Sequence, residues 1–387
     1  MFTDGQQNPA HSFRYLGTRL GAVARPRAKK RFVPFRRLRR TALCYVAAVA
    51  VATVMAAGCA SGSGGTGGSA GAGSAGSAGT TVTIALPVAE PVQAPVYLAS
   101  KLGYFSKQGI NAHIVVLSGD SAADAALVAG SVQFTSVNAE ALISAKQKGV
   151  PLDDICTEYD GPSWALAVSN SVLSSTHVTA SMPLKQLLTA LHGIKIAIVG
   201  SAAAAPGLIL TGLLKEEGLP ANWFDLVGVE ASGDLSSAYA HGEVGAIFDT
   251  QPTPDQLIST SSGKVIYNTT QIAALSQVPW EGLVGDSSYV SGNAKVDRAV
   301  CAALGQADNY LLKNPGSSAS DLASTFPSLS PALLRSSLLA YKWAPNATMS
   351  AAQWAASASV LAKFGLVSKV SPSTLRALYS TSYLPAG

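Results

Sequence analysis

Residues 112–149, AHIVVLSGDSAADAALVAGSVQFTSVNAEALISAKQKG, carry the clearest indication of fold class in this chain. They contain two short apolar runs rich in β-branched residues, Ala112–Leu117 and Val132–Ser136. Each run is followed by a helical pattern that ends at a glycine, Gly130 or Gly149. Strands that alternate with helices in this way are typical of a parallel sheet with helices on its faces. The stretch therefore predicts an α/β fold.

The same alternation continues on both sides. A strand at Val82–Leu86 and a helix at Ala94–Leu102 precede it. A second series follows, with expected strands at Ile194–Val199, Phe224–Val229 and Val244–Asp249 and helices at Pro206–Glu217 and Ser232–His241. Amphipathic helices are then expected at Lys295–Lys313, Pro331–Tyr341 and Ala351–Phe364. Two α/β series followed by returning helices predict two lobes, with residues 81–168 and 266–387 in lobe 1 and residues 169–265 in lobe 2.

Residues 1–58 have the composition of an export signal. Eleven Lys and Arg residues and one acidic residue precede Cys59, and Thr41–Ala57 is an uninterrupted apolar run. The segment Met55–Cys59, MAAGC, resembles a bacterial lipobox, which predicts attachment of acyl chains such as palmitate at Cys59. The alternative is an uncleaved signal anchor, because seventeen apolar residues reach the lower limit for a membrane span. Either alternative places the remaining chain outside the cytoplasm, by the Sec or the twin-arginine route.

The segment that follows predicts a flexible tether at residues 59–80, because residues 60–80 consist only of Ser, Gly, Ala and Thr. From Cys59 onward the chain carries 16 basic and 21 acidic residues, so that part has a net charge of about −5 although the whole chain is +5. The basic charge belongs to the leader, and we therefore expect no nucleic-acid partner.

Five segments, in order along residues 81–345, resemble those of solute-binding proteins for nitrate, taurine, alkanesulfonates and thiamine-pyrimidine precursors. They are Leu98–Ile110 (LASKLGYFSKQGI), Ala126–Phe134 (ALVAGSVQF), Leu191–Ile198 (LHGIKIAI), Ala240–Ile247 (AHGEVGAI) and Tyr310–Pro315 (YLLKNP). Gln133 departs from the Asp usual in the second segment, and the fourth also lacks its Asp. The resemblance implies a type II periplasmic-binding-protein architecture, in which two α/β lobes joined by two crossing hinge strands close on a ligand in the cleft. It also implies a monomeric component of an ABC importer that captures a small organic solute and delivers it to permease subunits.

Candidate ligand contacts follow from the fold rather than from the resemblance. In open parallel α/β sheets, ligands bind beyond the carboxyl ends of the strands, where helices begin. The loops at those ends and one nearby aromatic residue supply Glu90, Gln93, Ser118, Gly119, Ser136, Asn138, Trp164, Ser201, Ala202 and Asp249. Several have structural alternatives: a helix N-cap for the turn at residues 118–121, a turn or cap for Asp249, a tight packing turn after Gly200, and core packing for the aromatic side chain.

The same loops bear on the class of solute. The turn after Gly200 has Ala202–Ala205, where the sulfonate-binding members of the family tend to have more Ser, Thr or His. No Arg in these loops is placed to hold an anion with two hydrogen bonds. A neutral, zwitterionic or cationic organic solute is therefore favoured over a strongly charged anion.

Catalysis is not expected. The histidines after the leader are isolated, and the spacings of a metal site or a phosphate-binding loop are lacking, so neither a metal nor a cofactor is predicted. These histidines are His113, His177, His192 and His241. Cys156 and Cys301 are candidates for a disulfide, as expected in an exported domain. The alternatives are two buried thiols or a nucleophile in an enzyme of the same fold. A ligand-sensing surface lipoprotein is a further alternative to an importer component.

Overall fold

The computed structural model describes residues 79–260 and 263–379, which belong to one unit of the chain. The expected export signal, Cys59 and all but the end of the tether lie outside the described residues. Within the described ranges no helix is both long enough and apolar enough to cross a membrane.

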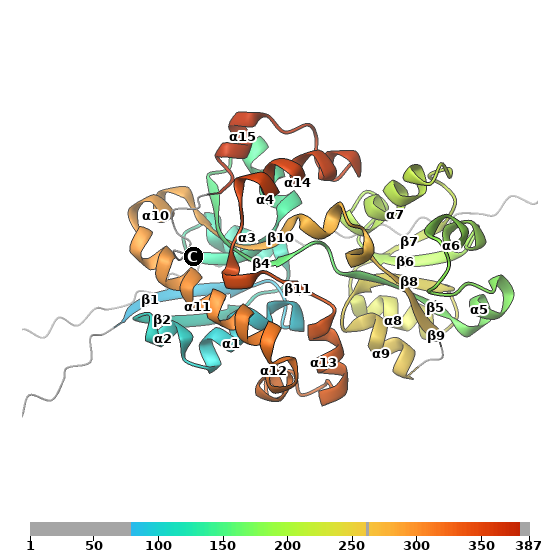
Figure 1. The fold of residues 1–387 in the computed structure, drawn as a ribbon, viewed down its shortest axis with the longest axis horizontal. Helices are drawn as coiled ribbons and strands as arrows, with labels where there is room; N and C mark the ends of the chain where they lie inside the picture. Colours follow the sequence, from blue (N-terminus) through green and yellow to red (C-terminus); the bar gives the residue numbers. More distant parts are fainter. Residues whose placement is uncertain (1–78, 261–262, 380–387) are drawn as a thin grey trace, which may run out of the picture. The chain divides into compact units, whose positions relative to one another are not determined.

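The first sheet has six strands in the order β11-β4-β10-β3-β1-β2. Strands β1, β2 and β3 are parallel, whereas β10 runs antiparallel to β3 and β4, and β11 runs antiparallel to β4. Their bounds are β1 Thr80–Leu86, β2 Ile110–Val116, β3 Phe134–Asn138, β4 Leu152–Asp160, β10 Pro279–Asp286 and β11 Lys342–Trp343. The central strands are almost completely buried because helices cover both faces of this sheet (Figure 1).

Helices from both ends of the described chain pack on this sheet. In Figure 1, α1, α2 and α11 lie on one side of it, and α4, α14 and α15 on the other. The bounds on this side of the molecule are η1 Pro91–Gln93, α1 Ala94–Lys101, α2 Tyr104–Lys107, α3 Asp120–Val128, α4 Ala139–Gln147, α10 Ser287–Gly292, α11 Ala294–Lys313, α12 Pro315–Leu322, α13 Pro331–Leu339, η4 Pro345–Ala347, α14 Ala351–Lys363 and α15 Pro372–Arg376. The segments before residue 160 and after residue 279 therefore form one lobe.

The second sheet has five strands in the order β7-β6-β8-β5-β9. Strand β5 runs antiparallel to both of its neighbours, and β6, β7 and β8 are parallel. The elements are β5 Trp164–Ser169, α5 Asn170–Thr176, α6 Leu184–Ala190, β6 Lys195–Val199, α7 Ala205–Glu216, β7 Asp225–Val229, α8 Ser232–Ala240, β8 Ala246–Thr250, α9 Thr253–Thr260 and β9 Gly263–Asn268. In Figure 1, α6 and α7 lie on one side of this sheet, and α8 and α9 on the other. This is the second lobe, and the predicted two-lobed α/β fold is confirmed.

The chain passes between the sheets twice, at residues 161–163 and at residues 269–278. The second crossing contains η2 Thr269–Gln271 and η3 Leu275–Gln277. The buried Thr269 joins the two crossings, because its hydroxyl donates to the Pro162 carbonyl at 2.6 Å and accepts from the Trp164 N–H at 2.9 Å. The boundary between the lobes was expected after residue 168, but the sheets place it before β5, because the whole of β5 pairs within the second sheet.

Helices of the return segment also contact the second lobe. The Ser336 hydroxyl on α13 donates to Asp255 Oδ2 on α9 at 2.6 Å. At the end of α14, Lys363 forms an ion pair with Glu216 on α7. The return segment thus holds the second lobe at two places in this structure.

Cys156 on β4 and Cys301 on α11 form a disulfide with their Cα atoms 5.7 Å apart. Both residues are completely buried. The bond links the central part of the first sheet to the longest helix that covers it.

Candidate functional site

The carboxyl ends of the parallel strands from both sheets meet where the two lobes contact each other. Trp164 is the first residue of β5, and Trp280 lies near the start of β10. Their ring centroids are 5.4 Å apart in an edge-to-face arrangement. Tyr341, just before β11, donates its hydroxyl to the Gln251 carbonyl, just after β8, at 2.9 Å. This interlobe surface is the place where a ligand of an open α/β sheet is expected.

Two carboxylates with raised pKa values lie near this surface, one in each lobe. Glu90 precedes η1 in the first lobe, and Asp249 lies near the end of β8 in the second. Burial raises the pKa of Glu90 to about 7, and the negative charge of Asp249 contributes to the rise. Burial also raises the pKa of Asp249, although the Ser232 and Thr253 hydroxyls and the Thr250 N–H lower it in part. An ionised Asp249 therefore disfavours ionisation of Glu90.

Asp249 is only 5% exposed, and its Oδ2 atom has no hydrogen-bond partner among the described residues. The charges of Glu90 and Asp249 also raise the pKa of the Tyr341 hydroxyl, after the larger effect of burial. A buried carboxylate oxygen without a partner costs free energy, and an ionised one costs more. Asp249 Oδ2 thus has unused capacity to accept a hydrogen bond in this structure.

Further carboxylates lie behind this surface in the first lobe. Burial raises the pKa of Glu281 on β10 well above its usual range, and the charges of Glu158 and Asp120 add to the shift. Burial raises the pKa of Glu158 on β4 to about 7. The carboxylates of Asp154 and Asp308, which are also buried, have raised pKa values for which burial is the largest cause and the Glu158 charge the next. The first lobe therefore holds several acidic groups that resist ionisation at neutral pH.

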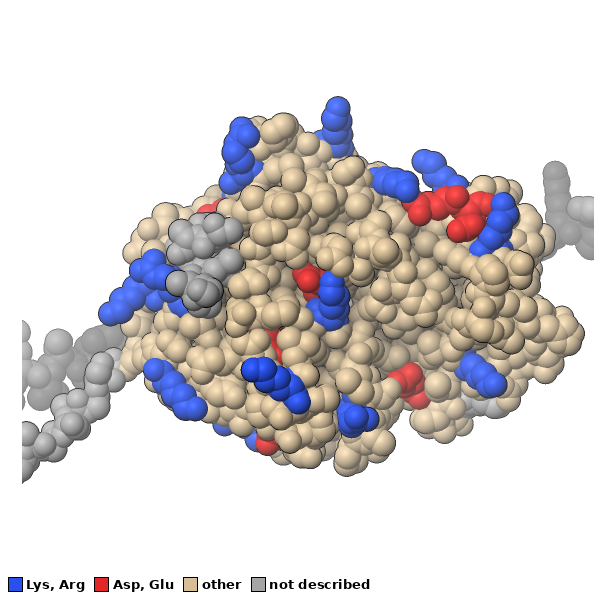
Figure 2. Space-filling model, in the orientation of Figure 1, with Lys and Arg blue, Asp and Glu red and all other residues tan. Residues whose placement is uncertain are grey.

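Basic side chains do not neutralise the buried carboxylates described above. The ion pairs of the described chain join Lys146 to Asp153, Lys342 to Asp160 and Lys363 to Glu216, and none of them includes Glu90 or Asp249. On the face shown in Figure 2, Lys and Arg side chains are scattered singly over a surface that is mostly neither basic nor acidic. No group of three or more His, Cys, Asp or Glu residues in the described part of the chain has the arrangement of a metal site.

The sequence-predicted site residues fall into three sets. Glu90, Trp164 and Asp249 lie at the interlobe surface, and the partly buried Trp164 ring also contacts Phe248 at 6.1 Å between centroids. Their positions support a role in ligand contact, which remains a prediction.

The second set is engaged in bonds within the lobe. The Ser136 hydroxyl donates to Gln93 Oε1 at 2.8 Å, and both side chains are buried. Asn138 begins α4, where its Oδ1 accepts the Ala141 N–H at 2.9 Å. Asn138 is thus an N-cap.

The third set lies on loops. Gly119 precedes α3 with a φ of 97°, a value that few residues other than glycine adopt, and Ser118 beside it is exposed. Ser201 and Ala202 are exposed before α7, and the Ser201 hydroxyl accepts the Ala203 N–H at 3.2 Å. This turn lies directly against α7, because a Cβ atom on Gly207 would lie 2.5 Å from the Ala202 carbonyl oxygen.

Sequence reasoning missed Tyr341, Gln251 and Glu281. Glu281 lies within the apolar run of β10, and an acidic residue inside a buried strand was a usable signal. Tyr341 and Gln251 are 90 residues apart, and no local pattern relates them.

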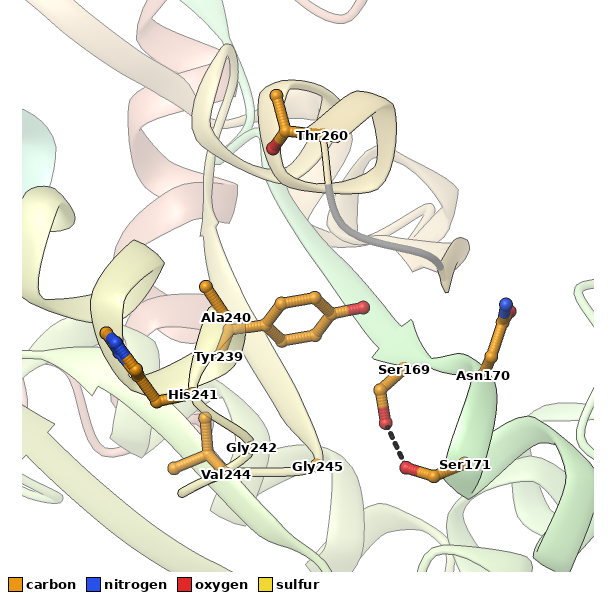
Figure 3. Close-up of a pocket in the computed structure, with 10 residues that line it drawn as sticks. All are labelled: Ser169, Asn170, Ser171, Tyr239, Ala240, His241, Gly242, Val244, Gly245 and Thr260. Atoms are coloured by element: carbon orange, nitrogen blue, oxygen red, sulfur yellow. Dashed lines mark hydrogen bonds between the residues drawn. The ribbon is translucent and has the colours of Figure 1, made fainter.

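A separate pocket of about 620 Å³ lies in the second lobe (Figure 3). Its lining includes Ser169, Ser171, Tyr239, His241 and Thr260. Figure 3 shows the Tyr239 ring directed across the pocket toward Ser169, whose hydroxyl bonds that of Ser171. Because β5 runs antiparallel to β8, this pocket lies at the opposite end of the strands from Trp164 and Asp249. It brings together none of the predicted site residues.

The enzyme alternative required a free thiol at Cys156 or Cys301. Both sulfur atoms are joined to each other in a buried disulfide, so neither is a nucleophile in this form of the chain.

Comparison with known proteins agrees with this architecture. The profile of the family described as NMT1/THI5 like matches residues 90–318, which is more than half of the chain. No curated protein matches by sequence.

Solved structures similar to this chain share the fold. One is the periplasmic aliphatic sulphonate-binding protein SsuA from Escherichia coli, with 18% identity, a TM-score of 0.61 and coverage of 79% of this chain and 94% of that one. Another is the alkanesulfonate-binding protein SsuA from Xanthomonas axonopodis pv. citri bound to MOPS, with 17% identity, a TM-score of 0.59 and coverage of 78% and 99%. A Candida albicans gene product described as having the generic periplasmic binding protein fold has 14% identity, a TM-score of 0.58 and coverage of 79% and 98%.

Proposed function

The chain belongs to the NMT1/THI5-like family, and from this premise we propose that it is the extracytoplasmic solute-binding component of an ABC importer. It captures a small organic solute between its two lobes and delivers it to permease subunits in the membrane. It performs no chemistry on the solute.

The observation that carries the proposal is the meeting of the strand ends of both sheets at one interlobe surface. Glu90 and Asp249 come from different lobes, and a solute bound between them would contact both. The two crossings, joined through Thr269, are the places where the lobes would rotate relative to each other.

We also propose that the chain is exported and held at the outer face of the cell membrane through acyl chains on Cys59. The proposal rests on the basic and apolar leader, the lipobox-like segment and the Gly/Ser/Ala tether of the sequence. Labelling of producing cells with a palmitate analogue tests it. Label is expected on the wild-type chain and not on Cys59→Ser, and equal labelling of both would contradict it.

The binding role is tested with the full chain purified in mild detergent. The chain is incubated with the small-molecule part of yeast extract, dialysed and denatured, and the released solutes are identified by mass spectrometry. We expect a retained solute and a higher melting temperature in its presence, because a ligand that binds only the folded state stabilises it. A chain that retains nothing and shows no thermal shift would contradict the proposal.

Rotation of the lobes is tested separately by small-angle scattering. The Tyr341–Gln251 and Ser336–Asp255 bonds join the two lobes in this structure, so rotation of the lobes would break them. The radius of gyration is therefore expected to differ between the solute-free and the solute-bound chain. Identical scattering curves with bound solute would refute capture by lobe rotation.

A further inference from the structure

We propose that residues 336–342, called here the latch segment, hold the two lobes together and thereby regulate solute capture. The proposal rests on the proposed function and adds a means of control at the same interlobe surface. It depends on four hydrogen bonds, two that join the latch segment to the second lobe and two that join it to the crossings.

The latch segment is attached to both crossings and to the first lobe. On the first crossing, the buried Ser163 donates its hydroxyl to the Ala340 carbonyl at 2.7 Å. Lys342 Nζ donates to the Ser276 carbonyl on the second crossing at 2.7 Å and lies 3.8 Å from Asp160 Oδ2. The segment then enters β11, which pairs with β4 in the first sheet. It is therefore a part of the first lobe that lies against the hinge.

Tyr341 is held in place by aromatic side chains of the first lobe. Its ring centroid lies 5.2 Å from that of Tyr159 and 5.1 Å from that of Trp343, and Tyr341 is only 5% exposed. From this position its hydroxyl reaches the second lobe and donates to the Gln251 carbonyl at 2.9 Å. A donor fixed in one lobe reaches an acceptor in the other only when the lobes have the arrangement of this structure, which we call closed.

The two acceptors of the second lobe form one unit at the start of α9. Gln251 Nε2 donates to Asp255 Oδ1 at 3.0 Å, and Gln251 Oε1 accepts the Asp255 N–H at 3.3 Å. The other carboxylate oxygen, Asp255 Oδ2, accepts the Ser336 hydroxyl at 2.6 Å. Two donors of the latch segment thus bond two acceptors that are tied to each other.

These bonds lie beside the surface where we propose that the solute binds. Helix α13 contacts both η1 of the first lobe and α9 of the second, and it lies where the lobes meet in Figure 1. Gln251 directly follows β8, whose carboxyl end belongs to the interlobe surface. A solute enters or leaves this surface when the lobes separate, and that separation breaks both bonds to the second lobe.

The latch segment therefore favours the closed arrangement. One hydrogen bond changes an equilibrium of this kind by roughly two- to tenfold. The bond of Tyr341 is buried whereas Ser336 is exposed, so we expect the Tyr341 hydroxyl to contribute more. Loss of both bonds is expected to raise the ratio of open to closed chains about tenfold. A solute that binds the closed arrangement then requires a correspondingly higher concentration.

Tyr341→Phe and Ser336→Ala, alone and together, remove the two hydroxyl groups and keep the aromatic packing. Tyr310→Phe and Ser337→Ala are the matched controls, because they remove hydroxyl groups that bond within the first lobe. Ser337 follows Ser336 on the same helix, so this pair compares the same substitution with and without a bond to the second lobe.

Nitroxide labels on the full chain in mild detergent report the separation of the lobes. They are attached at two exposed positions, Ser259→Cys on α9 and Ser320→Cys on α12, with Cys44 and Cys59 replaced by Ser. The remaining two cysteines form the disulfide and take no label. Pulsed electron spin resonance then gives the distribution of distances between the labels.

We expect one population of short distances in the solute-free chain without latch substitutions and in both control variants. Tyr341→Phe and Ser336→Ala are each expected to add a population at longer distances, which is largest when they are combined. Distributions that the latch substitutions leave unchanged, or that the controls alter equally, overturn the proposal.

A second measurement separates the latch from solute capture. The small-molecule part of yeast extract is titrated into the unlabelled variants, and the amount that gives half of the maximal thermal shift is determined. The double latch variant is expected to require about tenfold more than wild type, and the controls the same amount as wild type. An equal requirement in all variants overturns regulation by the latch segment. No thermal shift in any variant, together with longer distances in the latch variants, contradicts solute capture and supports the latch.

Discussion

Replacement of Glu158 by Gln tests how the buried acidic groups affect stability. Glu158 lies on β4 and is completely buried, and the Ser136 hydroxyl near it donates instead to Gln93. Burial raises the pKa of Glu158 from 4.5 to about 7, and the proximity of Ser136 lowers it only in part. Gln has the shape of the protonated side chain and cannot ionise.

The direction of the pH effect follows from the raised pKa. Below about pH 4.5, Glu158 is protonated in both the folded and the unfolded chain, so its full contribution to stability is present. As the pH rises toward 7, the unfolded chain ionises first, and the free energy of unfolding falls. The difference between 4.5 and about 7 corresponds to roughly 3 kcal/mol lost by pH 8.

Urea unfolding followed by tryptophan fluorescence measures this loss. At pH 8, Glu158→Gln is expected to be more stable than wild type by roughly 3 kcal/mol, whereas at pH 4.5 the two are expected to agree within about 1 kcal/mol. The exposed Glu243→Gln is the control and is expected to follow wild type at both pH values. A Glu158→Gln variant whose stability difference from wild type is the same at both pH values would refute the reasoning.

Three other perturbations test the packing. The variant with both Cys156→Ala and Cys301→Ala is expected to lose about 2–5 kcal/mol in denaturant unfolding, because the disulfide closes a loop across 145 residues, and a reductant is expected to affect wild type but not this variant. Gly207→Ala is expected to cost about 1–3 kcal/mol, because its Cβ would lie 2.5 Å from the preceding turn, whereas Gly233→Ala has open space and is expected to stabilise by at most about 1 kcal/mol. Thr269→Val is expected to lower the free energy of unfolding by about 1–3 kcal/mol, and Thr269→Ser to retain most of it, because only the hydroxyl bonds the other crossing. Three comparisons test these assignments: the cysteine variant with wild type, Gly207→Ala with Gly233→Ala, and Thr269→Val with Thr269→Ser. Equal unfolding midpoints in any one of them would contradict the corresponding assignment.

The helices and the parallel strands could be predicted because their signals are local. The strand expected at Val82–Leu86 is β1, Thr80–Leu86, and the helix expected at Lys295–Lys313 is α11, Ala294–Lys313. Apolar periodicity determines these elements within ten to twenty residues.

The insertion of β10 between β3 and β4 could not be predicted in the same way. The expectation after residue 265 was of helices, but Pro279–Asp286 crosses the centre of the first sheet. Its antiparallel pairing joins Glu281 to Asn138 across more than 140 residues, and loop closure over such a distance leaves no local signal. The lobe division after residue 168 could not be predicted correctly for a similar reason. Which sheet contains β5 depends on its pairing with the distant strands β8 and β9.

The candidate site shows the same separation between local and distant information. The capping role of Asn138 follows from its position one residue before a helix. The effect of the Asp249 charge on Glu90 depends on how the two lobes meet, and the contribution of Tyr341 depends on a third segment.

The most direct test of solute capture between the lobes is a crystal structure of the full chain grown with a yeast-extract solute that raises its melting temperature. The account predicts electron density for the solute between η1 and the end of β8, within hydrogen-bond distance of Glu90 and Asp249. Density in the second-lobe pocket beside Ser169 and Tyr239, with the interlobe surface closed and empty, would contradict it.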